Sequence, residues 1–245
     1  MIATKAARVC IAAKGKEVME FGCRRAQGSD GALSASRASY IGGVDFTSTL
    51  LAGEIYDIPV KGTHAHSWVM AFDSEKEAFE AYARSIPNNC VFLVDTYKTL
   101  DGVKKAIEVG KALRKEGKEL YGIRLDSGDL AYLSIRSREL LDQAGFHDTK
   151  IIVSNELDEF IIHDLINQGA CIDIWGVGTS MVTSKGHSAL DGVYKMSAMK
   201  EENGDWEYKL KLSEQMTKMT NPGILQLRRF YGSNGHCIGD AIYNE

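Results

Sequence analysis

A strand-like apolar run that ends in polar or glycine residues recurs along the middle of the chain. It is found at residues 91–95, 121–130, 150–155 and 172–179, and helical patterns separate these runs. The spacing is about the thirty residues of a strand-helix-strand unit, and strands joined in this way lie parallel. Because parallel strands share the direction of their carboxyl ends, we expect the polar residues that close these runs to face one common site.

The rest of the chain places helices around this sheet. Apolar residues at helical spacing, with caps and glycine stops, predict helices over 3–13, 30–43, 47–53, 73–85, 99–117, 130–145 and 156–168, and a strand over 18–21. Ser74 opens a capping-box pattern at the start of helix 73–85. Helix 156–168 is expected to bury Leu157, Phe160, Ile161 and Leu165.

After residue 182 the pattern becomes an alternation of apolar and polar residues, at 193–199, 206–212 and 224–231, with turn-like sequences at 203–205 and 233–235. The chain is therefore predicted to be α/β. Residues 1–190 would form an incomplete (β/α) barrel of the TIM-barrel type with mostly parallel strands, and residues 191–245 an antiparallel β unit. Because the chain opens on a helix and stops after a strand, we expect both ends to be cut from a larger protein.

Composition excludes several classes of function. Lys and Arg total 29 against 33 Asp and Glu, and no block of like charge stands out, which argues against a nucleic-acid-binding surface. No apolar run approaches the roughly 20 residues that span a bilayer, so we expect a soluble, cytoplasmic protein without a membrane partner. The 5 cysteines are scattered without a Cys-x-x-Cys pair, which predicts neither a disulfide framework nor a zinc site.

The polar side chains at the strand ends suit a phosphorylated, hydroxyl-rich ligand. Arg124 and Asp126 alternate onto one side of a strand, where the guanidinium suits a phosphate or carboxylate and the carboxylate suits ribose hydroxyls. The Gly-Val-Gly-Thr sequence at 176–179 is either a glycine turn or a loop whose backbone N–H groups hold phosphate. Ser154 and Asn155 either cap the next helix or face the same ligand.

His64 and His66 are two residues apart in a segment rich in glycine and threonine. This spacing does not fit a metal pair on a helix, so no metal site is predicted there. The pattern alone leaves two alternatives open. The histidines either form only hydrogen bonds in a loop, or one imidazole acts as a nucleophile towards phosphate or as an acid-base group.

Taken together, these segments resemble the nicotinate phosphoribosyltransferase family and, more distantly, the sister nicotinamide enzymes. They occur in the family's order and cover most of the chain to about residue 199. The matching segments are Glu-Phe-Gly-x-Arg-Arg at 20–25, Thr-Ser-Thr-Leu-Leu-Ala-Gly at 47–53, Gly-Thr-x-Ala-His-Ser at 62–67, Ile-Arg-Leu-Asp-Ser-Gly-Asp at 123–129, Ser-Asn-Glu-Leu-Asp at 154–158 and Gly-Val-Gly-Thr at 176–179.

The resemblance implies a type II phosphoribosyltransferase of NAD salvage, which joins nicotinate to phosphoribosyl pyrophosphate and releases nicotinate mononucleotide and pyrophosphate. It further implies that ATP hydrolysis is coupled through a phosphohistidine, that Mg²⁺ accompanies the pyrophosphate, and that the enzyme is a homodimer. Matched residue by residue, the catalytic positions are His66, which takes the phosphate, Asp126 and Arg124, and the substrate-binding positions are Phe21, Arg24, Thr49, Ser154, Asn155, Gly176, Gly178 and Thr179.

The chain departs from the family's pattern in two respects. Family members are longer and begin with a portion that completes the site across a dimer interface, so we expect this chain alone to be folded but catalytically poor. Thr49 stands where the family often has an asparagine. The alternatives are a nicotinamide-using enzyme, a non-catalytic phosphoribosyl- or nucleotide-binding domain, and a quinolinate-type phosphoribosyltransferase, which His66 disfavours.

Overall fold

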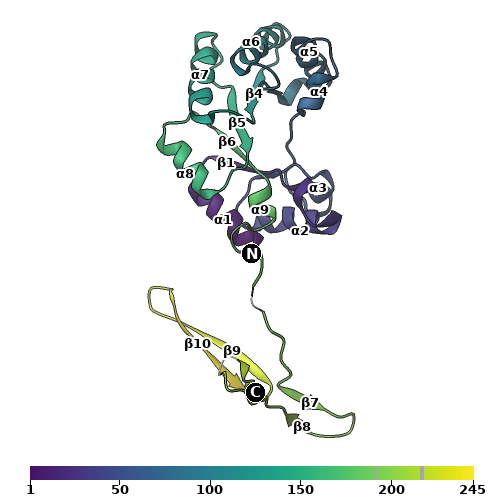
Figure 1. The fold of residues 1–245 in the computed structure, drawn as a ribbon, viewed down its shortest axis with the longest axis vertical. Coiled ribbons are helices and arrows are strands. Elements are labelled where there is room, and N and C mark those ends of the chain that lie inside the picture. The colour runs from purple at the N-terminus through teal and green to yellow at the C-terminus, as the bar shows by residue number, and fades with distance from the viewer. Residues whose placement is uncertain (191, 216–217) are drawn as a thin grey trace. The chain divides into compact units, whose positions relative to one another are not determined.

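The computed structural model describes residues 1–190, 192–215 and 218–245 (Figure 1). Contacts between residues divide the chain into unit 1, Met1–Ala189, and unit 2, Leu190–Glu245. Unit 1 holds a parallel sheet with its helices, and unit 2 holds antiparallel strand pairs. Among the described residues, no helix combines the length and the apolar character needed to cross a membrane.

Unit 1 is built on a parallel sheet of six strands in the order β2-β1-β6-β5-β4-β3. The strands are β1 Glu17–Glu20, β2 Phe46–Thr47, β3 Cys90–Leu93, β4 Leu120–Leu125, β5 Lys150–Asn155 and β6 Ile174–Val177. Because β6 pairs with β1, the sheet curls into an open half-barrel whose edge strands are β2 and β3 (Figure 1). This arrangement confirms the predicted incomplete barrel of parallel strands.

Helices connect the strands and cover the outer face of the half-barrel (Figure 1). They are α1 Ile2–Ala12, α2 Gly28–Ile41, α3 Leu50–Tyr56, α4 His66–Met70, α5 Glu75–Ser85, α6 Thr99–Lys115, α7 Leu130–Gln143, α8 Glu159–Asn167 and α9 Thr179–Val182, with the 3₁₀ turns η1 Cys23–Arg25 and η2 Pro87–Asn89. The predicted cap is present, because the Ser74 hydroxyl accepts a hydrogen bond from the Glu77 N–H.

The predicted burial of α8 was wrong in part. The helix begins at Glu159, because the Asp158 carboxylate accepts the N–H groups of Phe160 and Ile161 and so caps it there. These two side chains are 69% and 38% exposed. Ile162 and Leu165, one turn apart, face the core in their place.

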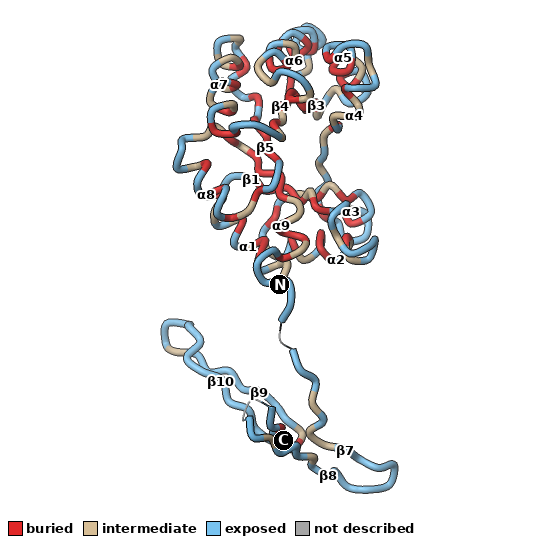
Figure 2. The backbone as a smooth tube through the Cα atoms, viewed as in Figure 1, coloured by how far each residue is buried: buried red, intermediate tan, exposed pale blue. Residues whose placement is uncertain are grey.

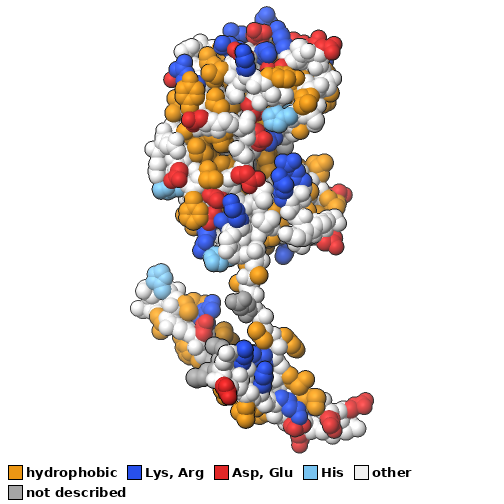
Figure 3. Space-filling model, viewed as in Figure 1, with side chains coloured by type: hydrophobic (Ala, Val, Ile, Leu, Met, Phe, Trp, Pro, Cys, Tyr) orange, Lys and Arg blue, Asp and Glu red, His pale blue; other side chains and the backbone are white. Residues whose placement is uncertain are grey.

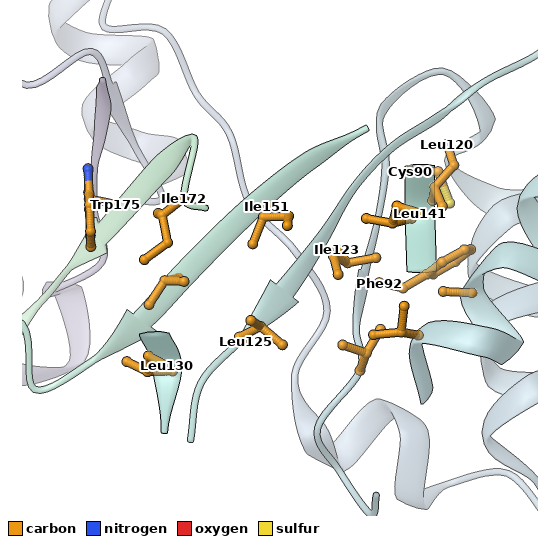
Figure 4. Close-up of a cluster of buried hydrophobic side chains, with 14 of the residues drawn as sticks. Cys90, Phe92, Leu120, Ile123, Leu125, Leu130, Leu141, Ile151, Ile172 and Trp175 are labelled. Atoms are coloured by element: carbon orange, nitrogen blue, oxygen red, sulfur yellow. The ribbon is translucent and has the colours of Figure 1, made fainter. Parts of the chain in front are cut away.

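The main core lies between the sheet and the helices. Figure 2 shows the buried residues following the strands and the sheet-facing sides of the helices of unit 1. Figure 4 shows how side chains from neighbouring strands meet in this layer, among them Phe92, Ile123, Leu125, Ile151 and Trp175. Burial of such apolar surface is the main force that stabilises the half-barrel.

A second, smaller apolar cluster is formed by strand residues of the opposite parity. It contains Met19, Val91, Ile152 and Ile174, which are all nearly inaccessible to solvent. Side chains alternate between the two faces of a strand. The main core lies on the outer face of the half-barrel, under the helices, so this second cluster lies on the inner face.

Unit 2 contains two antiparallel strand pairs within its described residues. β7 Ala198–Lys200 pairs with β8 Trp206–Tyr208, and β9 Leu225–Tyr231 pairs with β10 Cys237–Asn244. The predicted antiparallel character is confirmed. The predicted strand at 193–199 was too long, because only its last residues form ladder contacts.

Candidate active site

A cavity of about 560 Å³ opens at the carboxyl ends of the strands of unit 1. Figure 3 shows basic, acidic and histidine side chains gathered on one face of unit 1, over the region between α4 and α9. Of the predicted site residues, all except Thr49 line this cavity. The lining residues that were predicted are Phe21, Arg24, His66, Arg124, Asp126, Ser154, Asn155, Gly176, Gly178 and Thr179.

Arg124, near the end of β4, is held by hydrogen bonds in three directions. Its Nε donates to Ser154 Oγ at 2.7 Å, its Nη1 to Thr63 Oγ1 at 2.9 Å and its Nη2 to Asp126 Oδ1 at 2.9 Å. The Ser154 hydroxyl also donates to Asp126 Oδ1. The predicted convergence of Arg124 and Asp126 is therefore present, and Ser154 on the neighbouring strand β5 completes the group.

This network sets the charge of Asp126. Burial alone would raise the pKa of its carboxyl, but the hydrogen bond from Ser154 and the nearby guanidinium of Arg124 outweigh burial and lower the pKa. The cavity consequently presents a carboxylate beside a guanidinium at neutral pH.

An aromatic ring forms one wall of the cavity. Phe21 follows β1, and the Arg124 Cζ lies 5.1 Å from the centre of its ring, in the range of a cation-π contact. Gly176 of β6 lies directly behind this ring, because a Cβ at position 176 would come within 2.9 Å of Phe21 Cδ2. The glycine predicted to belong to a phosphate loop therefore also makes room for the aromatic wall.

His66 is the first residue of α4 and its side chain is 38% exposed. Its Nδ1 lies 3.1 Å from Thr96 Oγ1, and its Nε2 lies 3.6 Å from Asp126 Oδ2 and 3.9 Å from Asp95 Oδ1. Two carboxylates thus face one ring nitrogen, and a hydroxyl faces the other. Both ring nitrogens of His66 therefore have polar neighbours in the cavity.

Sequence reasoning recognised Asp95 only as the residue that closes β3. In the structure its side chain is fully buried, and its Oδ2 accepts hydrogen bonds from the Asp126 N–H at 2.8 Å and from Ser127 Oγ at 2.7 Å. Its Oδ1 has no hydrogen-bond partner and faces His66. The signal was present in the sequence, because Asp95 occupies the same strand-end position as Asp126.

Thr49 lies outside the cavity. It precedes α3 as its N-cap residue, its side chain is largely buried, and its backbone N–H donates to Thr47 Oγ1 at 3.1 Å. The neighbouring Ser48 lines the cavity instead, and so do Arg25 and Glu156, which sequence reasoning did not select.

His64 points away from the cavity into the core, where it is 6% exposed. Burial, more than the nearby charges of Arg124 and His66, lowers its pKa from 6.5 to about 4. The two histidines of the segment therefore occupy different surroundings, a hydrophobic one for His64 and a polar one for His66.

The donor groups of the described residues do not enclose a metal ion by themselves. Within the described residues, there is no cluster of three or more His, Cys, Asp or Glu side chains arranged to hold one. The buried and unpartnered Asp95 Oδ1, beside Asp126, is a donor of the type that Mg²⁺ shares with substrate phosphates.

Comparison with known proteins gives a consistent family. A model of the nicotinate phosphoribosyltransferase (NAPRTase) family matches residues 16–211. The chain is 47% identical over 249 residues to nicotinate phosphoribosyltransferase of Bacillus subtilis, in an alignment that covers 100% of this chain and 50% of that protein. It thus spans about half the length of the curated relatives it matches.

Solved structures of related proteins share the fold. Human nicotinic acid phosphoribosyltransferase is similar with a TM-score of 0.78 and 28% identity, over 99% of this chain and 55% of that chain. A nicotinate-nucleotide pyrophosphorylase from Pyrococcus furiosus is similar with a TM-score of 0.70 and 26% identity, over 99% of this chain and 57% of that chain.

Proposed function

The chain belongs to the nicotinate phosphoribosyltransferase family, and we propose that its cavity joins nicotinate to phosphoribosyl pyrophosphate. The products are nicotinate mononucleotide and pyrophosphate, which places the reaction in NAD salvage. The observation that carries the proposal is that an aromatic wall after β1, the half-buried guanidinium and the carboxylate at the end of β4, and an imidazole of α4 meet in one cavity.

Nicotinate is a flat aromatic acid, and the cavity offers both of the contacts it needs. The Phe21 ring provides an apolar face for the pyridine ring, and Arg24 at the rim provides a cation for the carboxylate. Arg124 lies against the same aromatic ring and is oriented by Ser154. A fixed guanidinium favours the acid over the neutral amide, because only the carboxylate forms an ion pair with it.

In the transfer step the pyridine nitrogen of nicotinate forms a bond to C1 of the ribose, and the bond from C1 to the pyrophosphate oxygen breaks. The bonding electrons leave with pyrophosphate, so positive charge develops on the sugar. The Asp126 carboxylate, held ionised by Ser154 and Arg124, stabilises that charge. Gly178 and Thr179 line the cavity, and the bare backbone of the first and the hydroxyl of the second would hold the 5′-phosphate.

His66 is the residue proposed to couple ATP hydrolysis to this reaction. A nitrogen of its ring attacks the γ-phosphorus of ATP, the bond from that phosphorus to ADP breaks, and water later releases the phosphate from the ring. Asp95 and Asp126 stabilise the ring while it carries positive charge. Mg²⁺, held by these carboxylates together with substrate phosphates, would neutralise phosphate charge in both reactions.

The experiment measures product and phosphoprotein together. The protein is incubated with phosphoribosyl pyrophosphate, Mg²⁺ and ATP, with nicotinate, nicotinamide or quinolinate as the base, and the mononucleotide is quantified by chromatography. Intact-mass spectrometry detects the acid-labile phosphate. We expect product from nicotinate, and a phosphate that is lost in His66→Ala and retained in the control His163→Ala, whose ring lies on the exposed surface of α8.

Two results would overturn the proposal. Product formed from quinolinate or nicotinamide in preference to nicotinate would move the chain to another phosphoribosyltransferase activity. Binding of phosphoribosyl pyrophosphate with neither product from any of the bases nor phosphorylation of His66 would identify a binding domain.

A further inference from the structure

The segment between α3 and α4, residues 57–65, closes the open side of the half-barrel, and we call it the strap (Figure 1). Its first half pairs with the edge strand β2, where the Thr47 N–H donates to Pro59 O at 3.0 Å and the Lys61 N–H donates to Thr47 O at 3.2 Å. Its end reaches the other edge strand, β3. The strap therefore spans the gap that a further strand would fill in a closed barrel.

The middle of the strap is fixed to the inner face of the half-barrel. Lys61 Nζ donates to Tyr121 Oη at 2.9 Å and lies 3.7 Å from the centre of the Phe46 ring. Thr63 Oγ1 accepts a hydrogen bond from Arg124 Nη1 at 2.9 Å. The strap is thus attached both to β2 and to a residue of the cavity before it reaches the histidines.

The last attachment of the strap is a hydrogen bond between a backbone group and an imidazole. The Leu93 N–H of β3 donates to His64 Nε2 at 3.1 Å. The next N–H group, that of Val94, donates to Arg124 O in β4 at 3.1 Å. Successive N–H groups of a strand point to opposite sides, so the Leu93 N–H points away from the sheet and would lack a ladder partner without the strap.

The surroundings of His64 suit this single purpose. Its ring packs edge-on against Tyr82, with centroids 4.8 Å apart, and lies within 6.4 Å of the Phe79 and Phe92 rings. Because burial lowers its pKa to about 4, the ring is neutral at neutral pH and Nε2 keeps a lone pair for the Leu93 N–H. The proton resides on Nδ1, which faces Ala65 O at 3.4 Å.

We propose that His64 is a positioning residue that holds His66 in the cavity by docking the end of the strap on the edge of β3. Ala65 alone separates the two histidines and caps α4, where the Trp68 N–H donates to Ala65 O at 3.0 Å. Trp68 Nε1 fixes α4 to Ala78 O of α5 at 3.0 Å. His64 fixes the chain just before α4. The ring of His66, the first residue of that helix, then reaches Thr96 and Asp126.

The test combines a structural readout with a chemical one, and only the chemical one rests on the proposed function. Hydrogen exchange of the Leu93 and Trp68 amides is measured in the wild type, His64→Ala and His64→Gln. The rate of His66 phosphorylation is measured at saturating Mg-ATP in the same proteins. His64→Gln is the rescue variant, because its side-chain oxygen can accept the Leu93 N–H. Val109→Ala, a core change in α6 away from the strap, is the control for lost stability alone.

In His64→Ala we expect faster exchange at both amides and a phosphorylation rate lower on the order of a hundredfold, since small misplacements of a reacting group have effects of this size. The ATP concentration for half-saturation should change by less than about twofold. His64→Gln should recover most of the rate, and Val109→Ala should retain it.

Two outcomes would refute the positioning role: unchanged exchange at Leu93 and Trp68 in His64→Ala, or an equal loss of rate in Val109→Ala. If the wild type forms no phosphohistidine, the proposed function fails instead. The amide exchange then decides the positioning role alone.

Discussion

Replacing Asp126 by asparagine separates the charge of this residue from its hydrogen bonds. The amide oxygen of an asparagine can still accept the hydrogen bonds that Arg124 and Ser154 donate to Asp126 Oδ1. The negative charge that faces His66 is lost. We therefore expect Asp126→Asn to slow the phosphorylation of His66 while the fold remains intact.

The geometry sets the size of the effect. Asp126 Oδ2 and His66 Nε2 are 3.6 Å apart, and two unit charges at this distance attract each other by about 4.6 kcal/mol at an effective dielectric constant of about 20. The side chains of His66 and Asp126 are 38% and 30% exposed, and solvent screening of such pairs reduces the attraction to about 1–2 kcal/mol. Because the ring gains positive charge as its nitrogen attacks phosphorus, the rate should fall about five- to thirtyfold.

The rate is measured by rapid quenching after mixing with labelled Mg-ATP, and stability by thermal unfolding. The matched control is Asp129→Asn, the same change at an exposed residue that caps α7 through the Tyr132 N–H. Asparagine caps helices as well as aspartate does, so the control should keep both rate and stability. An unchanged rate in Asp126→Asn, or an equal fall in the control, would refute the reasoning.

Three further perturbations follow from the structure. The pKa of His64 is lowered from 6.5 to about 4, so between these pH values the unfolded chain binds a proton there that the folded chain does not. The free energy of unfolding should therefore fall by up to about 3 kcal/mol as the pH is lowered from 6.5 to about 4. Urea titrations should show a smaller fall in His64→Gln. Gly176→Ala places a Cβ within 2.9 Å of Phe21 and so displaces the aromatic wall. Steady-state kinetics should show a higher KM for nicotinate, equivalent to a loss of about 1–2 kcal/mol in binding free energy, and a smaller change in the KM for phosphoribosyl pyrophosphate. Glu20 is buried and its Oε2 accepts hydrogen bonds from Ser36 and Thr47, so Glu20→Gln should lower stability by about 1–3 kcal/mol in denaturant unfolding.

The parallel sheet could be predicted because its strands are buried on both faces. The four-residue strand β3 is entirely buried, and so are the central residues 151–154 of β5, so both appear in the sequence as continuous apolar runs with a polar end. Apolar residues also recur at helical spacing over residues 99–117 and 130–145, and this pattern identified α6 and α7. The site followed from this, because a polar residue at the end of a buried parallel strand faces the same edge as its neighbours.

Other features depend on contacts that no local pattern contains. The pairing of β6 with β1, which curls the sheet, is made across most of the chain. Asp95 shares the strand-end position of Asp126 in the sequence, but its proximity to His66 depends on β3 and α4 lying side by side. The different surroundings of His64 and His66 arise because the strap crosses the sheet edge between them. Thr49 was selected by resemblance, and the turn before α3 presents Ser48 to the cavity instead.

The inner face of the half-barrel explains why the large cavity lies at the carboxyl ends of its strands. Moving two residues along a strand keeps a side chain on the same face and advances it about 7 Å towards the carboxyl end. In strand after strand this step leads from the small inner apolar cluster to the wall of the cavity. The pairs are Met19 and Phe21, Val91 and Leu93, Ile152 and Ser154, and Ile174 and Gly176. Because the strands are parallel, these second residues all lie on the cavity side of the cluster, and β4 adds Arg124, which pairs with Leu93 of β3. The apolar cluster beneath them is nearly inaccessible to solvent, so it holds the sheet together while several of the residues at the cavity are polar or charged. At the cavity the sheet contributes these strand-end side chains, and the strap adds Gly62, Thr63 and Ala65 to the wall where the sheet itself stops.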